Sequence, residues 1–167
     1  MKRLFAAIKI LPDNEFLTDF RGLKGMLRGD QIKWVEEHNI HITLKFFGET
    51  DESLIPIIGR ILGERSANSG IPSFRLSGLG IFGSRYDPRV IWTGIEPFEA
   101  LVDLMRDLQR DMVPAGFSVD RQNLVPHLTL ERIKTIRDKT HFQHVIDQYQ
   151  AIISEQFAPG EIILFES

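Results

Sequence analysis

The sequence contains the tetrapeptide His-x-Thr-Leu twice, at residues 41–44 and at residues 127–130. Histidine titrates near neutral pH, so one of two imidazoles at a common site can accept a proton while the other donates one. Hydrolysis of a phosphodiester needs both transfers, because the attacking water loses a proton and the leaving oxygen gains one. The paired motifs therefore predict an acid–base site built on His41 and His127, and this scheme requires no metal.

Threonine follows each histidine at the same offset. Side chains alternate between the two faces of an extended strand, so His41 shares a face with Thr43, and His127 shares a face with Thr129. The apolar residues between them point to the opposite face, into a core. The two hydroxyls can then donate hydrogen bonds to a negatively charged transition state. Threonine is also common in strands, and its link to a histidine is what favours the catalytic interpretation.

Two other interpretations of the histidines stand beside this one. They could be unrelated strand residues that are hydrogen-bonded at the surface, but two copies with the same threonine favour catalysis. They could also be zinc ligands, although further ligands at a suitable spacing are not evident in the sequence. The remaining histidines, His38 in a turn and His141 and His144 on a late helix, are expected at the surface.

Hydrophobic periodicity and turn residues predict the elements that must position these motifs. Strands are expected over 4–10, 32–35, 40–47, 74–76, 79–82, 90–95, 125–132, 151–157 and 161–165. Helices are expected from Asp13 to about Leu27, from Thr50 or Asp51 to about Arg65, over 98–113 and over 140–148. Turns or loops are expected over 83–88 and through Arg121, Gln122 and Asn123. This order predicts an α+β fold with largely antiparallel sheets and helices on the outside.

Length and composition limit the class of protein. The chain has 167 residues, of which 43% are hydrophobic and 26% charged, which is typical of a globular domain or of two small lobes with a shared core. The absence of cysteine excludes disulfides and thiolate chemistry and fits a cytoplasmic location. A net charge of −3 argues against a general polyanion binder, so a nucleic acid should contact a local basic cluster. The apolar start of the chain is too short for a signal peptide and is interrupted by Lys9, and no run is long enough to span a membrane.

Two further segments, Arg-Leu-Phe-Ala at 3–6 and Pro-Arg-Val-Ile-Trp at 88–92, accompany the motifs. With them the sequence resembles the 2H phosphoesterase superfamily, and within it the RNA 2',3'-cyclic phosphodiesterase branch, long called 2'-5' RNA ligase. The resemblance covers nearly the whole chain. It implies a single bilobal domain over 1–167, in which two intertwined lobes related by a pseudo-twofold axis each contribute one motif to a cleft between them.

The resemblance also implies an activity. Family members open a 2',3'-cyclic phosphate at an RNA end to a 2'-phosphate without metal or cofactor, and 2'-5' joining is the same chemistry in reverse. By this analogy His41 donates a proton to the leaving O3', and His127 activates water; the symmetry of the two motifs alone cannot distinguish these roles. Members usually continue past a strand like 161–165 into a last strand, whereas this sequence stops at Ser167, a departure that concerns the completeness of the sheet and part of the substrate wall.

Five residues are candidates for binding substrate or lining the cleft. Arg132 resembles a basic family residue that grips phosphate, but simple alternation places it opposite His127 unless the strand ends or twists first. Lys45 is expected on the face of the first motif, where it would supply positive potential or be solvated. Arg89 and Trp92 are candidates for the cleft wall, with Trp92 also a core candidate, and Phe5 is a candidate for base stacking or for the core.

Three functions fit these observations. The preferred one is a cytoplasmic, cofactor-free phosphodiesterase acting as a monomer on RNA ends or nucleotides with a 2',3'-cyclic phosphate, with no membrane and no obligatory protein partner. The second is a non-catalytic nucleotide-binding or RNA-binding module of the same fold. The third is a cyclic phosphodiesterase for a small metabolite that is not RNA.

Overall fold

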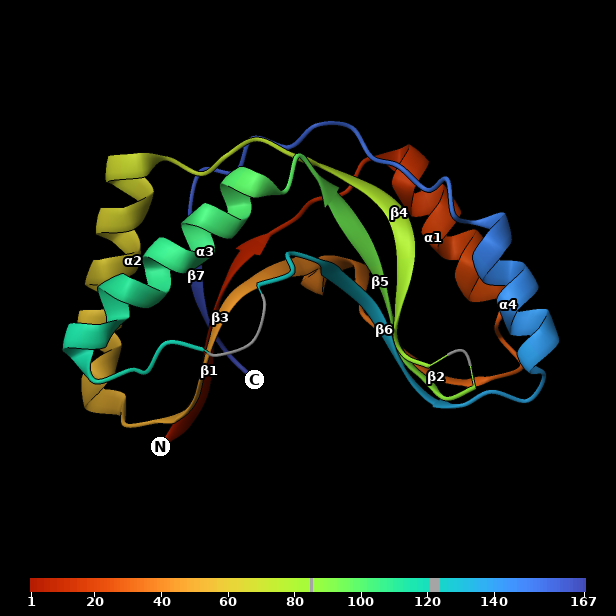
Figure 1. Ribbon diagram of the computed structural model, residues 1–167, viewed down its shortest axis with the longest axis horizontal. Coiled ribbons are helices and arrows are strands. Elements are labelled where there is room, and N and C mark those ends of the chain that lie inside the picture. Colours follow the sequence, from red (N-terminus) through yellow and green to blue (C-terminus); the bar gives the residue numbers. More distant parts are fainter. Residues whose placement is uncertain (85, 121–123) are drawn as a thin grey trace.

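The computed structural model describes residues 1–84, 86–120 and 124–167, and within them seven β-strands form one sheet flanked by four α-helices (Figure 1). The strands are β1 (Lys2–Lys9), β2 (Gln31–Trp34), β3 (His41–Thr50), β4 (Arg75–Gly83), β5 (Pro88–Glu96), β6 (Leu128–Thr135) and β7 (Ile163–Glu166). The α-helices are α1 (Asn14–Met26), α2 (Ile55–Ser69), α3 (Glu99–Met112) and α4 (Lys139–Gln148). The expected loop at Arg121, Gln122 and Asn123, and one residue of the expected turn over 83–88, lie outside the described residues.

The sheet runs in the order β4-β5-β6-β3-β1-β7, with β2 beside β6, and every pairing is antiparallel. We call β3, β1 and β7 the first half-sheet, and β4, β5, β6 and β2 the second half-sheet. The only register pair between β3 and β6 in the described chain is Ile42 with Leu128, so the expected two sheets meet at one point. The result is a strongly bent sheet whose two halves form an arch (Figure 1). The predicted α+β class with antiparallel pairing is confirmed.

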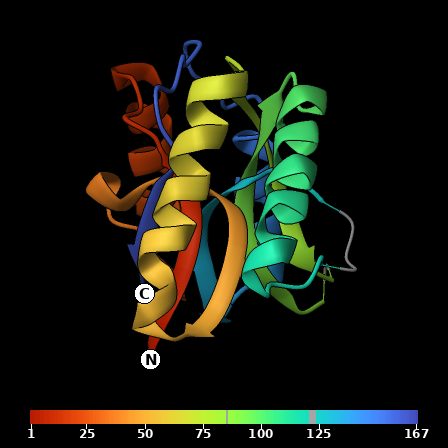
Figure 2. The same cartoon turned by 90° about the vertical axis from the view of Figure 1, so that its left-hand side faces the viewer.

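The helices cover the outside of the arch in two pairs (Figures 1 and 2). Helices α2 and α3 lie side by side against the first half-sheet, and α1 and α4 lie together against the second. Strand β1 of the first half leads into α1 on the second, and β5 of the second half leads into α3 on the first. Each half therefore contains a helix that follows a strand of the other. Because all four α-helices lie on the outside, the concave side of the arch is free of helices.

Local sequence explains where most helices form. Helix α3 has one apolar stripe spaced at three and four residues, and all of its members are buried: Leu101, Leu104, Met105, Leu108 and Met112. Asp13 and Asp138 cap α1 and α4, because their carboxylates accept hydrogen bonds from the N–H groups of Phe16 and His141. These caps begin the helices within one residue of the predicted positions.

Several predicted elements differ from the observed ones. The second motif strand, expected over 125–132, is observed as β6 over Leu128–Thr135, so His127 directly precedes it and Arg132 lies within it. Helix α2 starts at Ile55 because Asp51 caps a short 3₁₀ turn, Glu52–Leu54, that precedes it. The two strands expected around Gly78 are one strand, β4, since Gly78 takes a positive φ of 76° at a bulge and lets the strand continue. The segment 151–157 forms only isolated bridges, at Ile153 and Phe157.

Candidate active site

The two motifs lie side by side at the centre of the arch. Ile42 is paired with Leu128, the equivalent position of the other motif, and the strands run antiparallel. Continuing this register by one residue in each direction sets His41 beside Thr129 and Thr43 beside His127. All four side chains are half-buried, whereas Ile42 and Leu128 are fully buried on the opposite face. Diagonal neighbours across such a pair are about 7–8 Å apart, so the two histidines are separated by roughly the span of one phosphate group and its two flanking oxygens.

The backbone fixes the same proton arrangement in both imidazoles. Nδ1 of His41 lies 2.6 Å from the carbonyl oxygen of Asn39, and Nδ1 of His127 lies 2.7 Å from that of Val125. A carbonyl oxygen can only accept a hydrogen bond, so each Nδ1 carries the proton that it donates. Nε2 is therefore the nitrogen that remains for chemistry in both rings, as a base when unprotonated and as an acid when protonated.

Neither threonine hydroxyl of the motifs makes a hydrogen bond with any other residue of the described ranges. Thr43 and Thr129 thus present two unoccupied donors on the face that carries the imidazoles. Such donors can hold the non-bridging oxygens of a phosphate between the two rings.

Aromatic rings support each imidazole from its own half-sheet. The His41 ring lies 5.1 Å from Phe5 and 5.7 Å from Phe165 between ring centroids. The His127 ring lies 4.8 Å from Phe82 and 6.1 Å from Trp92. These contacts pack each imidazole against rings of its own half-sheet and restrict its motion.

Phe5 and Trp92 are therefore part of the floor of the site. The Phe5 ring is only 8% exposed and is stacked on Phe165 at 5.2 Å, so it faces a histidine and another ring, and the predicted base stacking on Phe5 finds little exposed surface. Phe165 and Phe82 could not be predicted at this site, since β7 and β4 are distant in the chain from the motifs. Their positions opposite Phe5 and Val90 are evident only from strand pairing.

A β-bulge at the last residue of each motif changes the face of the residues that follow. Between Thr43 and Lys45 the extra residue is Leu44, because Ala7 pairs with Thr43 while the adjacent Ala6 pairs with Lys45. The second motif has the same irregularity. Trp92 pairs with Thr129 while the adjacent Ile91 pairs with Glu131, which makes Leu130 the extra residue. Simple alternation therefore fails after each motif, and by the same single step.

The expectation that Lys45 shares the face of His41 is wrong. Lys45 pairs with the core residue Ala6, its side chain is only 2% exposed, and Nζ lies 3.2 Å from the carbonyl oxygen of Ser118 and 3.4 Å from the Asp120 carboxylate. The bulge turns the ammonium group toward the segment after α3, so Lys45 ties that segment to the back of the sheet.

The bulge has the opposite effect on Arg132, which simple alternation places away from His127. Arg132 pairs with Val90, two residues from Trp92, and Trp92 contacts the His127 ring. Residues two apart in β5 share a face, so Arg132 lies on the face of His127 and Thr129, where its exposed guanidinium can reach a phosphate.

Glu131 occupies the position in the second motif strand that Lys45 occupies in the first. It is fully buried, and neither carboxylate oxygen has a hydrogen-bond partner among the residues described. Burial raises the pKa of Glu131 to about 8, so the side chain is mainly a neutral acid at pH 7. Its carboxyl group faces the core, because Glu131 pairs with the buried Ile91.

Arg89 does not extend the basic surface of the site. It is the extra residue at a bulge, since Phe82 pairs with Val90 and Gly83 with Pro88. Its guanidinium forms an ion pair of 2.7 Å with the exposed Asp87 in the same turn. The three other histidines, His38, His141 and His144, are exposed as expected.

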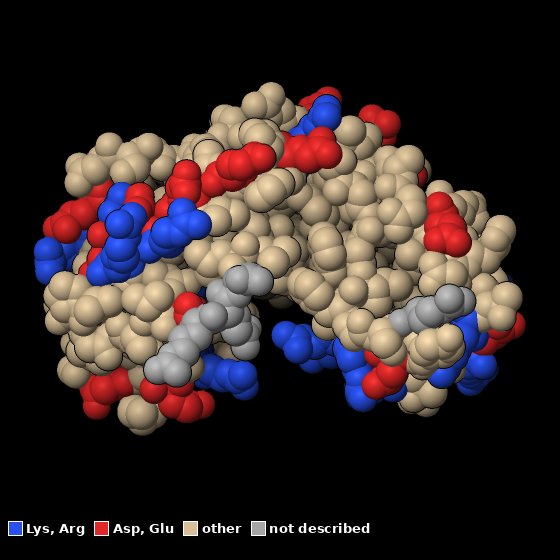
Figure 3. All heavy atoms as spheres, in the orientation of Figure 1, with Lys and Arg blue, Asp and Glu red and all other residues tan. Residues whose placement is uncertain are grey.

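The space-filling view shows a deep hollow between the two sides of the arch, with lysine or arginine side chains on both margins (Figure 3). Among the described residues no group of three histidine, aspartate or glutamate side chains is arranged to hold a metal ion. None of the helices in the described ranges has the length and apolar character needed to cross a membrane.

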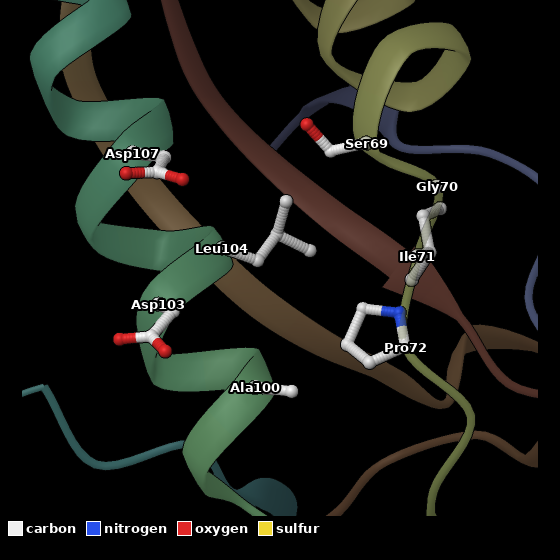
Figure 4. A pocket seen from close by; sticks show the side chains of 8 residues that line it. All are labelled: Ser69, Gly70, Ile71, Pro72, Ala100, Asp103, Leu104 and Asp107. Carbon is white, nitrogen blue, oxygen red and sulfur yellow. The ribbon is translucent and has the colours of Figure 1, made fainter.

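A second hollow lies between the end of α2 and α3, where Leu104 points toward Ile71 and Pro72 (Figure 4). Its two carboxylates, Asp103 and Asp107, form ion pairs with arginines of the helices. This hollow contains none of the residues predicted from the motifs.

Known proteins are similar to this chain in sequence and in fold. A model of the LigT like Phosphoesterase family matches residues 10–92. The RNA 2',3'-cyclic phosphodiesterase of Thermotoga maritima is 39% identical over 116 residues, which cover 70% of this chain and 62% of that protein. The RNA 2',3'-cyclic phosphodiesterase of Methanocaldococcus jannaschii is 33% identical over 99% of this chain and 91% of its own length. The crystal structure of Escherichia coli LigT complexed with 3'-AMP has a TM-score of 0.68 and 22% identity, and the superposition covers 99% of this chain and 88% of that one.

Proposed function

Because this chain belongs to the LigT-like phosphoesterase family, we propose that it is an RNA 2',3'-cyclic phosphodiesterase that uses His41 and His127 as its acid–base pair. The observation that carries the proposal is the register of the two motifs, in which Ile42 opposite Leu128 sets both imidazoles and both threonines on one face. The relatives in Thermotoga and Methanocaldococcus are named for this activity, and the structure of the E. coli relative holds a nucleotide.

In the proposed reaction the cyclic phosphate lies between the two rings. Nε2 of His127 takes a proton from a water molecule as its oxygen attacks phosphorus. The bond between phosphorus and O3' breaks, and Nε2 of His41, protonated at the start, gives its proton to the leaving O3'. The products are a 2'-phosphomonoester and a free 3'-hydroxyl, and the two histidines have exchanged protonation states. The same groups can run the reverse step with a ribose hydroxyl in place of water, which is 2'-5' joining.

The remaining groups stabilise charge. The hydroxyls of Thr43 and Thr129 donate to the non-bridging oxygens, and the Arg132 guanidinium balances their negative charge. Both proton transfers and the charge stabilisation are thus supplied by side chains of this chain. We therefore propose a metal-independent reaction. We also propose that the protein acts as a monomer, and that it acts in the cytoplasm, a location that its lack of cysteine fits.

The test is the turnover of 2',3'-cyclic AMP to 2'-AMP by purified protein, followed by chromatography that separates 2'- from 3'-AMP. Removing one general acid or base lowers the rate about 10²- to 10⁴-fold, so His41→Ala and His127→Ala should each lose at least about 100-fold in kcat. His144→Ala is the matched control, because that imidazole is exposed on α4, and it should keep full activity.

Three results would contradict the proposal. Full activity of either motif variant would remove that histidine from the reaction. Binding of 2'-AMP with no turnover by the unmodified protein would identify a nucleotide-binding module. A loss of turnover in EDTA that added divalent metal restores would refute metal independence, and this assay needs no variant.

A further inference from the structure

Basic side chains continue from the histidine pair along the second half-sheet. Lys33 of β2 pairs directly with Arg132 of β6, so the two share a face, and that face is the one of Thr129 and His127. Lys134 follows Arg132 by two residues, and it lines one open hollow together with Lys33 and Gln31. All three cations are exposed. We call Lys33, Arg132 and Lys134 the basic wall.

The three cations of the basic wall do not stabilise the fold. Like charges directly opposite each other on neighbouring strands repel, so the Lys33–Arg132 pair disfavours the sheet that contains it. No carboxylate in the described ranges forms an ion pair with any of the three residues, although the chain has 23 acidic and 20 basic residues. Uncompensated cations beside an anion-binding site indicate an anionic ligand that extends past the site.

The position of the basic wall indicates which ligand. Arg132 lies on the face of His127 and Thr129, and Lys134 follows two residues further along β6, a step of roughly 6–7 Å. This step is comparable with the spacing of phosphates along a single RNA strand. A cyclic phosphate closes the 3' end of an RNA, so all other phosphates of that RNA lie on its 5' side.

We propose that the basic wall binds the backbone phosphates of the nucleotides that precede the cyclic phosphate. This inference rests on the proposed function and narrows its substrate: the protein acts on RNA ends of several nucleotides in preference to cyclic mononucleotides. Arg132 binds the reacting phosphate, while Lys33 and Lys134 bind the phosphates on its 5' side. Such contacts carry no base specificity, so the preference depends on length and not on sequence.

The test compares two substrates in one double variant, Lys33→Gln with Lys134→Gln. With a pentanucleotide that ends in a 2',3'-cyclic phosphate, kcat/KM should fall about tenfold or more through KM. With 2',3'-cyclic AMP it should stay within about twofold. The salt dependence of oligonucleotide binding should also weaken, by about 0.7 in log–log slope for each RNA phosphate that no longer has a lysine partner.

The control is Lys24→Gln with Arg28→Gln, which removes the same charge from exposed positions in and after the last turn of α1 and should leave both substrates unchanged. An unchanged KM for the pentanucleotide in the Lys33→Gln, Lys134→Gln variant would overturn the inference, and so would an equal loss for both substrates or an equal loss in the control. If the unmodified protein cleaves neither substrate, the proposed function fails. The basic wall is then tested by fluorescence anisotropy with a labelled pentanucleotide, for which undiminished binding by the same double variant would refute it.

Discussion

Replacing Glu131 with glutamine should remove a large pH dependence of stability. In the unfolded chain this carboxyl has a pKa near 4.5, and in the folded protein burial raises the pKa to about 8. Between these values the folded state keeps a proton that the unfolded state has lost. Stability therefore falls as pH rises, by about 1.4 kcal/mol for each pH unit. From pH 5 to pH 8 the unmodified protein should lose roughly 3–4 kcal/mol from this one group.

The assay is thermal unfolding, followed by circular dichroism at pH 5, 6, 7 and 8. For a chain of this length 1 kcal/mol shifts Tm by about 2–4 °C, so the expected effect is roughly 10 °C over this range. Glutamine does not titrate, and any constant cost of burying its amide cancels when Tm differences are compared between pH values. Glu161→Gln, at an exposed glutamate, is the matched control.

The difference in Tm between Glu131→Gln and the unmodified protein should therefore grow steadily in favour of the variant as pH rises, while that of Glu161→Gln stays flat. A difference that does not change between pH 5 and pH 8 would refute the argument, because it would mean that the buried carboxyl is as easily ionised as in the unfolded chain. Catalytic activity at pH 6 should be retained, since the carboxyl faces the core and not the histidines.

Two further substitutions test how the site is supported. Gly80→Ala would drive a Cβ into the Trp92 ring that contacts His127. We therefore expect stability to fall by about 1–3 kcal/mol and kcat/KM to fall at least about tenfold. The control is Gly63→Ala, which has open space around it and should lose no activity. Retained activity in Gly80→Ala would show that the indole does not hold the imidazole. Lys45→Met removes the partner of Asp120 on the back of the sheet, so kcat/KM should stay within a few-fold of that of the unmodified protein. A loss of about tenfold or more in steady-state assays would show that Lys45 acts in the active site.

Residues within the motifs are predicted correctly where only alternation is needed. The shared face of His41 and Thr43 follows from the period of a strand, and so does the burial of Ile42. The bulges at Leu44 and Leu130 could not be predicted, because a bulge is set by register against a neighbouring strand that is distant in the chain. The same reason applies to Phe165, since nothing local links β7 to β1.

The paired bulges also explain how a nearly symmetric scaffold can bind an asymmetric substrate. The histidines and threonines are duplicated, so they cannot by themselves decide which way a cyclic phosphate lies. The residue after each bulge faces the core, and the next one returns to the site: Phe46 in β3, which pairs with Phe5, and Arg132 in β6. Phe46 is 63% exposed, so a phosphate bound between the two histidines as proposed would have an aromatic ring on one side and a cation on the other. A nucleotide is likewise apolar on its base and anionic on its backbone, and only one orientation matches both residues. Under the proposed function the two similar motifs would supply the chemistry, while the residues that differ just beyond the bulges would select the direction in which the substrate binds.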